Sequence, residues 1–172
     1  MFDVGTTLIA AAAREPCRLA LVDGDLRLSY RALLEKSLRL ASGLAEIGIK
    51  HGDHLLVLLQ NRAEMAILHW ATQISGIIVT PINWRAKSDE IDFFLQNSQS
   101  RAIVFEAASA SAIQGAQAAK TVPRIAVGGA FGGTHDFATL LGAPAAEARS
   151  KASAEDLSLM FYTSGTTGQC PP

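Results

Sequence analysis

The chain has 172 residues, 49% of them hydrophobic, which is enough for one sizeable core but not for two. Its 15 basic and 16 acidic residues give a formal charge of -1 and form no basic patch, so neither nucleic acid nor anionic lipid is an expected partner. The cysteines, Cys17 and Cys170, lack CxxC or Cys/His spacing, which argues against a disulfide framework or zinc site and favours a reducing, cytoplasmic location.

The first residues predict a helix rather than a targeting signal. Leu8–Ala13 is a short apolar run, but no basic residue precedes it, as one would in a signal peptide. Thr6 or Thr7 is a suitable N-cap for an amphipathic helix there. Nowhere do about 18 uncharged apolar residues occur together, the least that spans a bilayer, so no transmembrane segment is expected.

The distribution of apolar residues is typical of an α/β fold. Short runs rich in leucine or β-branched residues alternate with longer segments of helical spacing, which predicts a mainly parallel sheet flanked by helices on both faces. The residues expected to build the core are Leu56, Val57, Ile77, Val79, Ile103, Val104, Leu159 and Phe161.

A hairpin and a helix form the first expected unit. Two short strands, Leu19–Asp23 and Leu26–Ser29, flank turn chemistry at Gly24. Ser29 is a suitable N-cap for the next helix, whose apolar residues recur with helical spacing until Gly48.

The next unit is a pair of strands joined by a helix. His54–Leu59 and Ile77–Ile82 predict buried strands, and Asn61 with Glu64 is typical of a capping box that opens the helix between them. Ser88 is then expected to cap a third helix that ends near Asn97. The elements expected after it are a strand at 102–105, an alanine-rich helix at 107–119 and a strand at 124–127.

Composition divides the chain into three parts. Residues 1–127 are predicted to form the α/β layers. Residues 128–153, rich in Gly, Ala and small polar residues, predict a flexible surface connection with one helical turn near 137–141. Residues 154–172 are predicted to hold a last strand, Leu157–Tyr162, and the loop that follows it.

That loop has the chemistry of a phosphate-binding loop. Its hydroxyls can donate hydrogen bonds to phosphate oxygens, and its glycines let backbone N–H groups approach an anion closely. No lysine follows the second glycine, so the loop is not a Walker sequence, and the alternative is an ordinary Gly/Thr-rich turn. The predicted nucleotide-binding residues are Thr163, Ser164, Gly165, Thr166, Thr167 and Gly168.

Residues 161–168 resemble the signature loop of the adenylate-forming (AMP-binding) superfamily, which includes acyl-CoA synthetases, peptide-synthetase adenylation domains and luciferases. Upstream residues stand in the family's order, among them Leu28-Ser29-Tyr30, Gly52-Asp53 and Pro81-Ile82-Asn83. The resemblance implies an incomplete N-terminal subdomain of the adenylate-forming enzyme fold.

Within the superfamily, Pro81-Ile82-Asn83-Trp84-Arg85 resembles acyl-CoA ligases more than amino-acid-adenylating domains. The resemblance implies a reaction in two steps, with Mg²⁺ as a cofactor. A carboxylic or fatty acid attacks the α-phosphate of ATP to give an acyl-adenylate and pyrophosphate, and the thiol of CoA then displaces AMP. The loop would hold the β- and γ-phosphates.

The sequence also departs from the family. The family usually continues with Pro-Lys-Gly, whereas Gln169 is followed by Cys170-Pro171-Pro172. The family's later ATP-, Mg²⁺- and ribose-binding elements are not among these residues, so no catalytic or metal-binding residue is assigned and this segment alone is expected to be inactive. The alternatives are a stand-alone nucleotide- or phosphate-binding module, a degenerate interaction protein and a fragment of an amino-acid-adenylating domain.

The remaining candidate residues have local explanations. The four histidines share no ligand spacing, and Trp70 and Trp84 are expected to pack rather than to bind a ligand. The strand that ends at Tyr162 would lack a cover in a chain of this length, so we expect exposed apolar surface there and self-association.

Overall fold

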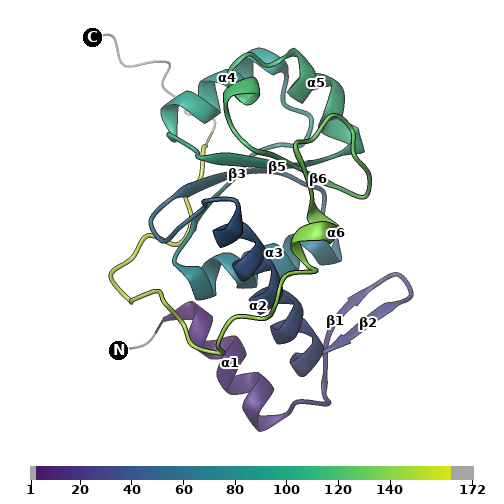
Figure 1. The fold of residues 1–172 in the computed structure, drawn as a ribbon, viewed down its shortest axis with the longest axis vertical. Helices are drawn as coiled ribbons and strands as arrows, with labels where there is room; N and C mark the ends of the chain where they lie inside the picture. The colour runs from purple at the N-terminus through teal and green to yellow at the C-terminus, as the bar shows by residue number, and fades with distance from the viewer. Residues whose placement is uncertain (1–2, 164–172) are drawn as a thin grey trace.

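The computed structural model of the chain describes residues 3–163. Within them, a parallel sheet of five strands lies between two groups of helices (Figure 1). The strands are β1 (Leu19–Asp23), β2 (Leu26–Ser29), β3 (His54–Leu58), β4 (Ile78–Pro81), β5 (Ala102–Glu106), β6 (Arg124–Val127) and β7 (His135–Asp136). The α-helices are α1 (Val4–Arg14), α2 (Tyr30–Glu46), α3 (Ala63–Ser75), α4 (Ser88–Asn97), α5 (Ala110–Gly115) and α6 (Phe137–Leu140), and the 3₁₀ helices are η1 (Ala107–Ser109) and η2 (Ala118–Thr121).

The five-stranded sheet has the order β4-β3-β5-β6-β7, with every pair parallel. Central strand β3 places Leu55 beside Val79 of β4 and beside Ala102 of β5. The predicted α/β class with a mainly parallel sheet is therefore confirmed. Strand β7 was not predicted, because a two-residue strand leaves no periodic signal in the sequence.

Each face of the sheet packs against its own helices. Helices α1, α2, α3 and α6 share one core with the sheet, and α4 and α5 share the other (Figure 1). Six of the predicted core residues are buried, namely Leu56, Val57, Ile77, Val79, Ile103 and Val104. The other two predictions were wrong, because Leu159 is 37% and Phe161 66% exposed.

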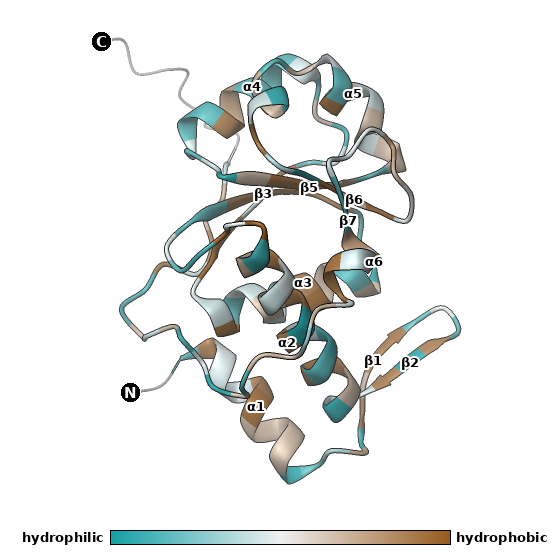
Figure 2. Ribbon diagram, viewed as in Figure 1, coloured by the Kyte–Doolittle hydropathy of each residue, from teal (hydrophilic) through white to brown (hydrophobic). Residues whose placement is uncertain are grey.

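Strands β1 and β2 form a separate antiparallel hairpin, as predicted, which projects from the body of the molecule (Figures 1 and 2). Ser29 caps α2 as expected, since its hydroxyl accepts a hydrogen bond from the backbone nitrogen of Ala32 at 3.3 Å. Gly48 lies just beyond the end of α2 with a φ of 88°, a conformation that glycine adopts readily.

Three predicted caps were wrong. Helix α1 is capped by Asp3, which accepts from the backbone nitrogen of Thr6, and not by Thr6 or Thr7. Helix α3 begins after Arg62, so Asn61 does not form a capping box with Glu64. Instead, the carboxylate of Asp23 in the distant hairpin accepts a hydrogen bond from Ala63 N.

The third wrong cap is Ser88, the first residue of α4. Its hydroxyl donates to the carbonyl of Ala112 in α5, while the backbone nitrogen of Lys87 donates to Glu90. Tertiary packing therefore takes the serine side chain away from the helix end that its position in the sequence suggested.

The alanine-rich segment is not one helix but η1, α5 and η2 in succession. At the start of η2, the carboxylate of Asp92 in α4 accepts hydrogen bonds from the backbone nitrogens of Gln117 and Ala118. These contacts hold a second turn in place and prevent the continuous helix that alanine favours.

Residues 128–153 contain more structure than the expected connection. The predicted helical turn exists as α6, and its Phe137 and Leu140 are buried in the core shared with α2. The segment 143–163, called here the C-terminal segment, has no helix or multi-residue strand. The predicted strand Leu157–Tyr162 was therefore wrong, since only a single bridge joins Leu159 to Val79.

No helix within residues 3–163 combines the length and the apolar character needed to cross a membrane.

Candidate functional site

The structure describes the approach to the predicted phosphate-binding loop and its first residue. Thr163 is exposed, and Ser164, Gly165, Thr166, Thr167 and Gly168 lie outside the described residues. The described part of the site consists of the residues that lead into the loop and of those that hold them.

The first anchor of the approach is the edge of the sheet. Val79 of β4 donates a backbone hydrogen bond to Ser158 O at 3.1 Å and accepts one from Met160 N at 2.9 Å. Because this bridge is parallel, the C-terminal segment runs at this point toward the carboxyl ends of the strands. That is the end of an open parallel sheet at which ligands usually bind.

The second anchor is the side chain of Tyr162. Its hydroxyl donates a hydrogen bond to Asn97 Oδ1 at 2.6 Å, and its ring centroid lies 4.6 Å from that of Phe94 and 6.2 Å from that of Phe93. All three partners belong to α4, which Figure 1 shows beside the last described residues. Burial raises the pKa of Tyr162, so its hydroxyl stays protonated and can donate at neutral pH.

Further contacts attach the C-terminal segment to the body below the sheet. Asp156 lies 2.7 Å from His51 Nε2, and Ser158 Oγ donates to Gln73 Oε1 at 2.6 Å. A backbone hydrogen bond from Ser153 and a side-chain bond with His51 lower the pKa of Asp156. The C-terminal segment is thus held against the body at several points before it reaches the loop.

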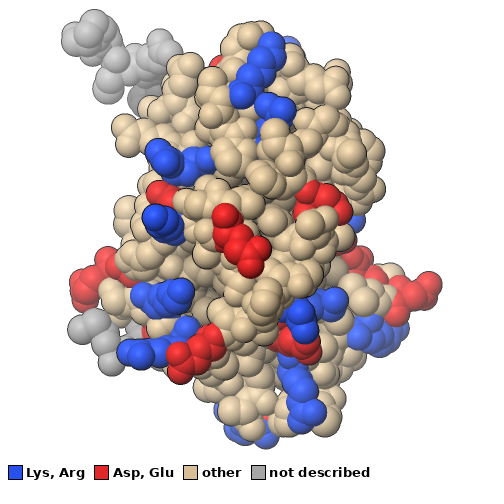
Figure 3. All heavy atoms as spheres, in the orientation of Figure 1, with Lys and Arg blue, Asp and Glu red and all other residues tan. Residues whose placement is uncertain are grey.

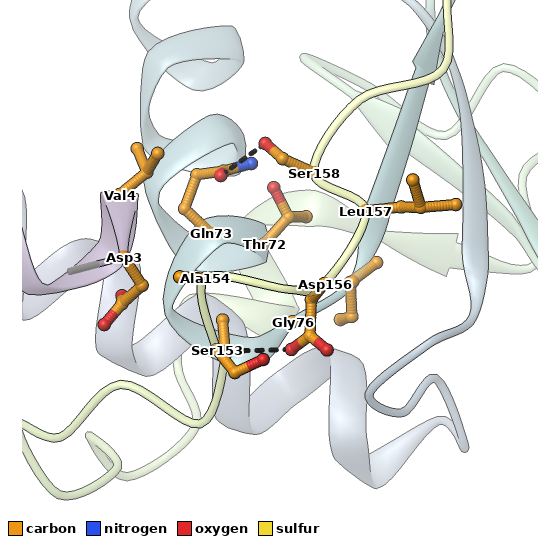
Figure 4. A pocket seen from close by; sticks show the side chains of 12 residues that line it. Asp3, Val4, Thr72, Gln73, Gly76, Ser153, Ala154, Asp156, Leu157 and Ser158 are labelled. Atoms are coloured by element: carbon orange, nitrogen blue, oxygen red, sulfur yellow. Dashed lines mark hydrogen bonds between the residues drawn. The ribbon is translucent and has the colours of Figure 1, made fainter. Parts of the chain in front are cut away.

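A small cavity lies between this segment, the start of α1 and the end of α3 (Figure 4). Gln73, Asp156 and Ser158 are among the residues that line it. Its volume of about 220 Å³ is below the range typical of sites for organic ligands. We therefore assign it to imperfect packing beneath the segment and not to nucleotide binding.

A network of polar side chains lies at the topological switch point of the sheet, between the carboxyl ends of β3 and β5. Strand β3 is followed by α3 on one face and β5 by α5 on the other, so the connections leave the carboxyl ends of β3 and β5 toward opposite faces, the position at which a ligand is expected in an open α/β sheet. Glu106 at the end of β5 accepts hydrogen bonds there from Gln60 N at 2.6 Å and Arg62 Nη1 at 2.7 Å.

Arg62 is held on its other edge by Glu64, with hydrogen bonds of 2.7 Å and 3.0 Å. The hydrogen bond with Glu64 raises the pKa of Arg62. Burial of Glu64 acts in the opposite direction, but the hydrogen bonds from Arg62 outweigh it and lower the pKa of Glu64. The three side chains form hydrogen bonds with one another. The network therefore holds the loop after β3 in place and needs no ligand as a partner.

The residues that resemble the acyl-CoA ligase motif lie after β4 and make local contacts. Asn83 Oδ1 accepts from Arg85 N at 3.0 Å, and the guanidinium carbon of Arg85 lies 3.8 Å from the centre of the Trp84 ring. Ser109 donates to the carbonyl of Trp84 at 2.8 Å. These contacts account for Trp84 and Arg85 without a ligand.

Figure 3 shows basic and acidic side chains interspersed over the face in view. Within the described part of the chain, no three His, Cys, Asp or Glu residues lie close enough together to hold a metal ion.

Sequence reasoning missed Asn97, Glu106 and Arg62. Glu106 offered a signal, since a carboxylate at the end of a buried apolar strand is unusual unless it has a partner. Asn97 offered none, because it was visible only as the expected end of a helix, 65 residues before its partner Tyr162.

The described residues thus define an α/β protein with an open parallel sheet whose last described residues lead into a Gly/Thr-rich sequence. The chain belongs to the AMP-binding enzyme family, whose model matches residues 8–170 and therefore includes the loop.

Individual relatives agree with this assignment. The chain is 30% identical over 170 residues to the long-chain-fatty-acid–CoA ligase FadD13 of Mycobacterium tuberculosis, covering 98% of this chain and 34% of the ligase. It is 30% identical over 161 residues to the 4-hydroxybenzoate–CoA/benzoate–CoA ligase of Rhodopseudomonas palustris, covering 88% of this chain and 29% of that enzyme. The chain thus spans about a third of the length of these curated relatives.

Among solved structures, the N-terminal domain of FACL13 from Mycobacterium tuberculosis superposes with a TM-score of 0.83 at 29% identity. The match covers 95% of this chain and 42% of that domain. The sheet and its helices therefore form the first part of an adenylate-forming N-terminal domain.

Proposed function

We propose that this chain supplies the N-terminal, phosphate-binding part of an ATP-dependent acyl-CoA ligase. The observation that carries the proposal is the family match, which runs through the loop Thr163–Gly168 and into the residues after it. Two relatives that share about 30% of its residues are CoA ligases of carboxylic acids, which favours this reaction class.

In the proposed reaction, a carboxylate oxygen attacks the α-phosphorus of ATP and pyrophosphate leaves, which gives an acyl-adenylate. The CoA thiol, after losing its proton, then attacks the acyl carbon and AMP leaves with the electrons of the broken bond. Neither step needs a nucleophilic side chain, because such reactions depend mainly on positioning and on stabilisation of negative charge.

The loop is assigned the β- and γ-phosphates. Its threonine and serine hydroxyls would donate to phosphate oxygens, and Gly165 and Gly168 would let backbone N–H groups face the anion. Mg²⁺ is expected to bind chiefly through the phosphates of ATP, as it does in most nucleotide sites, with its protein ligands outside the described residues.

An amino-acid-adenylating domain is the second candidate function. Both kinds of enzyme make an adenylate, so the loop does not separate them. Pro81-Ile82-Asn83-Trp84-Arg85 favours the acyl-CoA ligase. A stand-alone nucleotide- or phosphate-binding module is the third candidate, and Mg-ATP binding without any acid-dependent turnover would support it. A degenerate interaction protein is the fourth candidate, and weak or absent Mg-ATP binding by the complete polypeptide would support it.

Residues 1–172 alone are expected to have no ligase turnover, because they span about a third of the related enzymes. We also expect a cytoplasmic location, from the lack of a disulfide pattern, and self-association through the exposed apolar residues of the C-terminal segment.

The decisive experiment uses the complete natural polypeptide that carries residues 1–172. Pyrophosphate release from ATP is measured with a panel of fatty, aromatic and amino acids, and acyl-CoA formation is then measured with each active acid. Thr166→Ala/Thr167→Ala is the loop variant, and Thr121→Ala, a threonine remote from the loop in sequence, is the matched control.

An acyl-CoA ligase should release pyrophosphate only with a carboxylic acid, form the thioester only with CoA, and lose activity in the loop variant alone. Pyrophosphate release with amino acids and no CoA thioester would assign the second candidate. No nucleotide binding by the complete polypeptide would overturn both.

A further inference from the structure

Part of the C-terminal segment crosses the ends of α1 and α3 without contributing a buried side chain to the core. None of residues 144–158, called here the strap, is buried, whereas every residue of β5 is. Two cavities lie under the strap, one of about 220 Å³ (Figure 4) and one of about 330 Å³. Because burial of apolar side chains supplies most of the stability of a fold, a segment without it can detach while the rest stays folded.

Backbone hydrogen bonds and polar side chains hold the strap instead. Lys151 N donates to Ile74 O at 2.7 Å, and Val79 N donates to Ser158 O at 3.1 Å. Both amide protons are shielded from exchange with solvent while these bonds last. The amides of Lys151 and Val79, called here the reporter amides, therefore indicate whether the two ends of the strap are closed.

Asp156 and His51 join the strap to the body between these two bonds. One carboxylate oxygen of Asp156 lies 2.7 Å from His51 Nε2 and also accepts a hydrogen bond from Ser153 N at 2.8 Å (Figure 4). His51 packs directly on Gly76 at the end of α3, where any side chain would clash with the imidazole ring. A single carboxylate thus fixes the turn of the strap and attaches that turn to the body.

We propose that the strap opens and closes as one unit over a folded sheet, and that the pair His51–Asp156 is the clasp that keeps it closed. Opening uncovers the floor of the smaller cavity, where Thr72, Gln73 and Ile77 are otherwise buried. The opening requires no nucleotide, so it is independent of the proposed function.

The competing explanation is that each contact of the strap acts only on its immediate neighbours. Under it, loss of the contact between His51 and Asp156 would loosen the amide of Ser153 and leave both reporter amides as protected as before. A strap that opens as one unit links all three amides, because they become accessible to solvent in the same event.

The test is amide hydrogen exchange of the complete natural polypeptide, followed by mass spectrometry with single-residue resolution. Conditions are chosen so that closing is faster than exchange, and the exchange rate then measures the equilibrium between the closed and the open strap. Ile78 N donates to Asp53 O at 2.9 Å and is the internal reference, because it neighbours Val79 but is bonded within the body.

His51→Ala and Asp156→Ala should each raise the exchange rates of both reporter amides by one common factor, roughly threefold to tenfold, the effect of one lost hydrogen bond. Asp156→Asn keeps an oxygen that can accept from His51 and should restore most of the protection. Glu155→Ala, on the exposed strap residue beside the clasp, is the matched control and should exchange like the natural protein.

Acceleration confined to Ser153, or different factors at the two reporter amides, would overturn opening as one unit. An equal acceleration of Ile78 would also overturn it, because the sheet would then open with the strap. Unchanged rates in both His51→Ala and Asp156→Ala, or an equal increase in Glu155→Ala, would overturn the role of the clasp. Slow exchange of Ile78 in each variant shows that the variant is folded.

Discussion

The carboxylate of Asp23 accepts a hydrogen bond from the backbone nitrogen of Ala63 at 2.7 Å, although 40 residues separate them. Asp23 ends strand β1, and Ala63 is the first residue of α3, whose own N-cap residue Arg62 makes no side-chain capping bond. The hairpin therefore supplies the cap that the helix lacks, and it places a negative charge where the helix dipole favours one.

Asp23→Ala should lower the free energy of unfolding by about 1 kcal/mol, the usual loss for an N-cap residue. Asp23→Asn should keep most of the stability, because its amide oxygen can still accept from Ala63 N. Asp25→Ala, in the same turn, is the matched control. Urea unfolding of the three variants checks this, and equal stabilities for Asp23→Ala and Asp25→Ala would contradict the role of Asp23.

The network at the ends of β3 and β5 predicts a larger effect. Glu106→Gln keeps the shape of the side chain but removes the charge that faces Arg62, whose side chain is only 28% exposed while that of Glu106 is 10% exposed. We expect a loss of about 1–3 kcal/mol in the free energy of unfolding, typical of a hydrogen bond to a charged group.

The control for Glu106→Gln is Glu35→Gln, which breaks the exposed pair with Arg39 on α2. Its effect should stay within about 0.5 kcal/mol, as for most surface ion pairs. Similar losses in the two variants would show that the network at the sheet ends is no more important than a surface contact.

Stability should also depend on pH through His69. Burial on α3 lowers the pKa of His69, so the folded protein binds a proton there less readily than the unfolded chain does. The contribution of neutral His69 is therefore complete above about pH 6.5 and is lost as the pH falls through the lower pKa of the folded state.

His69→Gln should flatten the decline of stability below about pH 6.5 and leave the slope at higher pH unchanged. Urea unfolding of both proteins at intervals between pH 5 and pH 7.5 gives the two curves. Parallel curves across that range would rule out His69 as the source of the decline.

The apolar side chains of the C-terminal segment predict self-association of the 172-residue chain. Leu157 is 68% exposed, and Leu159 and Phe161 extend the same segment. Replacing all three with serine should lower the average mass in sedimentation velocity. Leu19→Ser/Val22→Ser removes exposed apolar side chains from the hairpin instead and should leave the average mass unchanged. An equal decrease in mass would show that the chains associate non-specifically through any exposed apolar surface.

The sequence was sufficient for features that depend on local pattern. The strands β3 to β6 and the helices α2 and α4 are close to their expected positions, because apolar periodicity and cap chemistry act within a few residues. The order β4-β3-β5-β6-β7 was not predicted, because the local sequence pattern of a strand does not indicate which strands become its neighbours.

The failures share one cause, which is that distant partners override local preference. Asn61 looked like a cap, but Asp23 provides one from the hairpin. Leu157–Tyr162 has the composition of a strand, yet it meets only one neighbour by a single bridge, so Leu159 and Phe161 remain exposed. For the site, the loop stays a prediction from its residues, whereas the contact between Tyr162 and Asn97, 65 residues apart, could be seen only in the fold.

The C-terminal segment also determines the order in which the protein can be completed during translation. Its contacts join residues far apart in the sequence: Ser150 bonds Asp3 across 147 residues, and Asp156 meets His51 across 105. At bacterial and eukaryotic elongation rates, a gap of 147 residues takes roughly 7–30 s to synthesise. During that time the start of α1 lacks the cover that the C-terminal segment later provides, so we expect this surface to be the one that a chaperone protects on the ribosome.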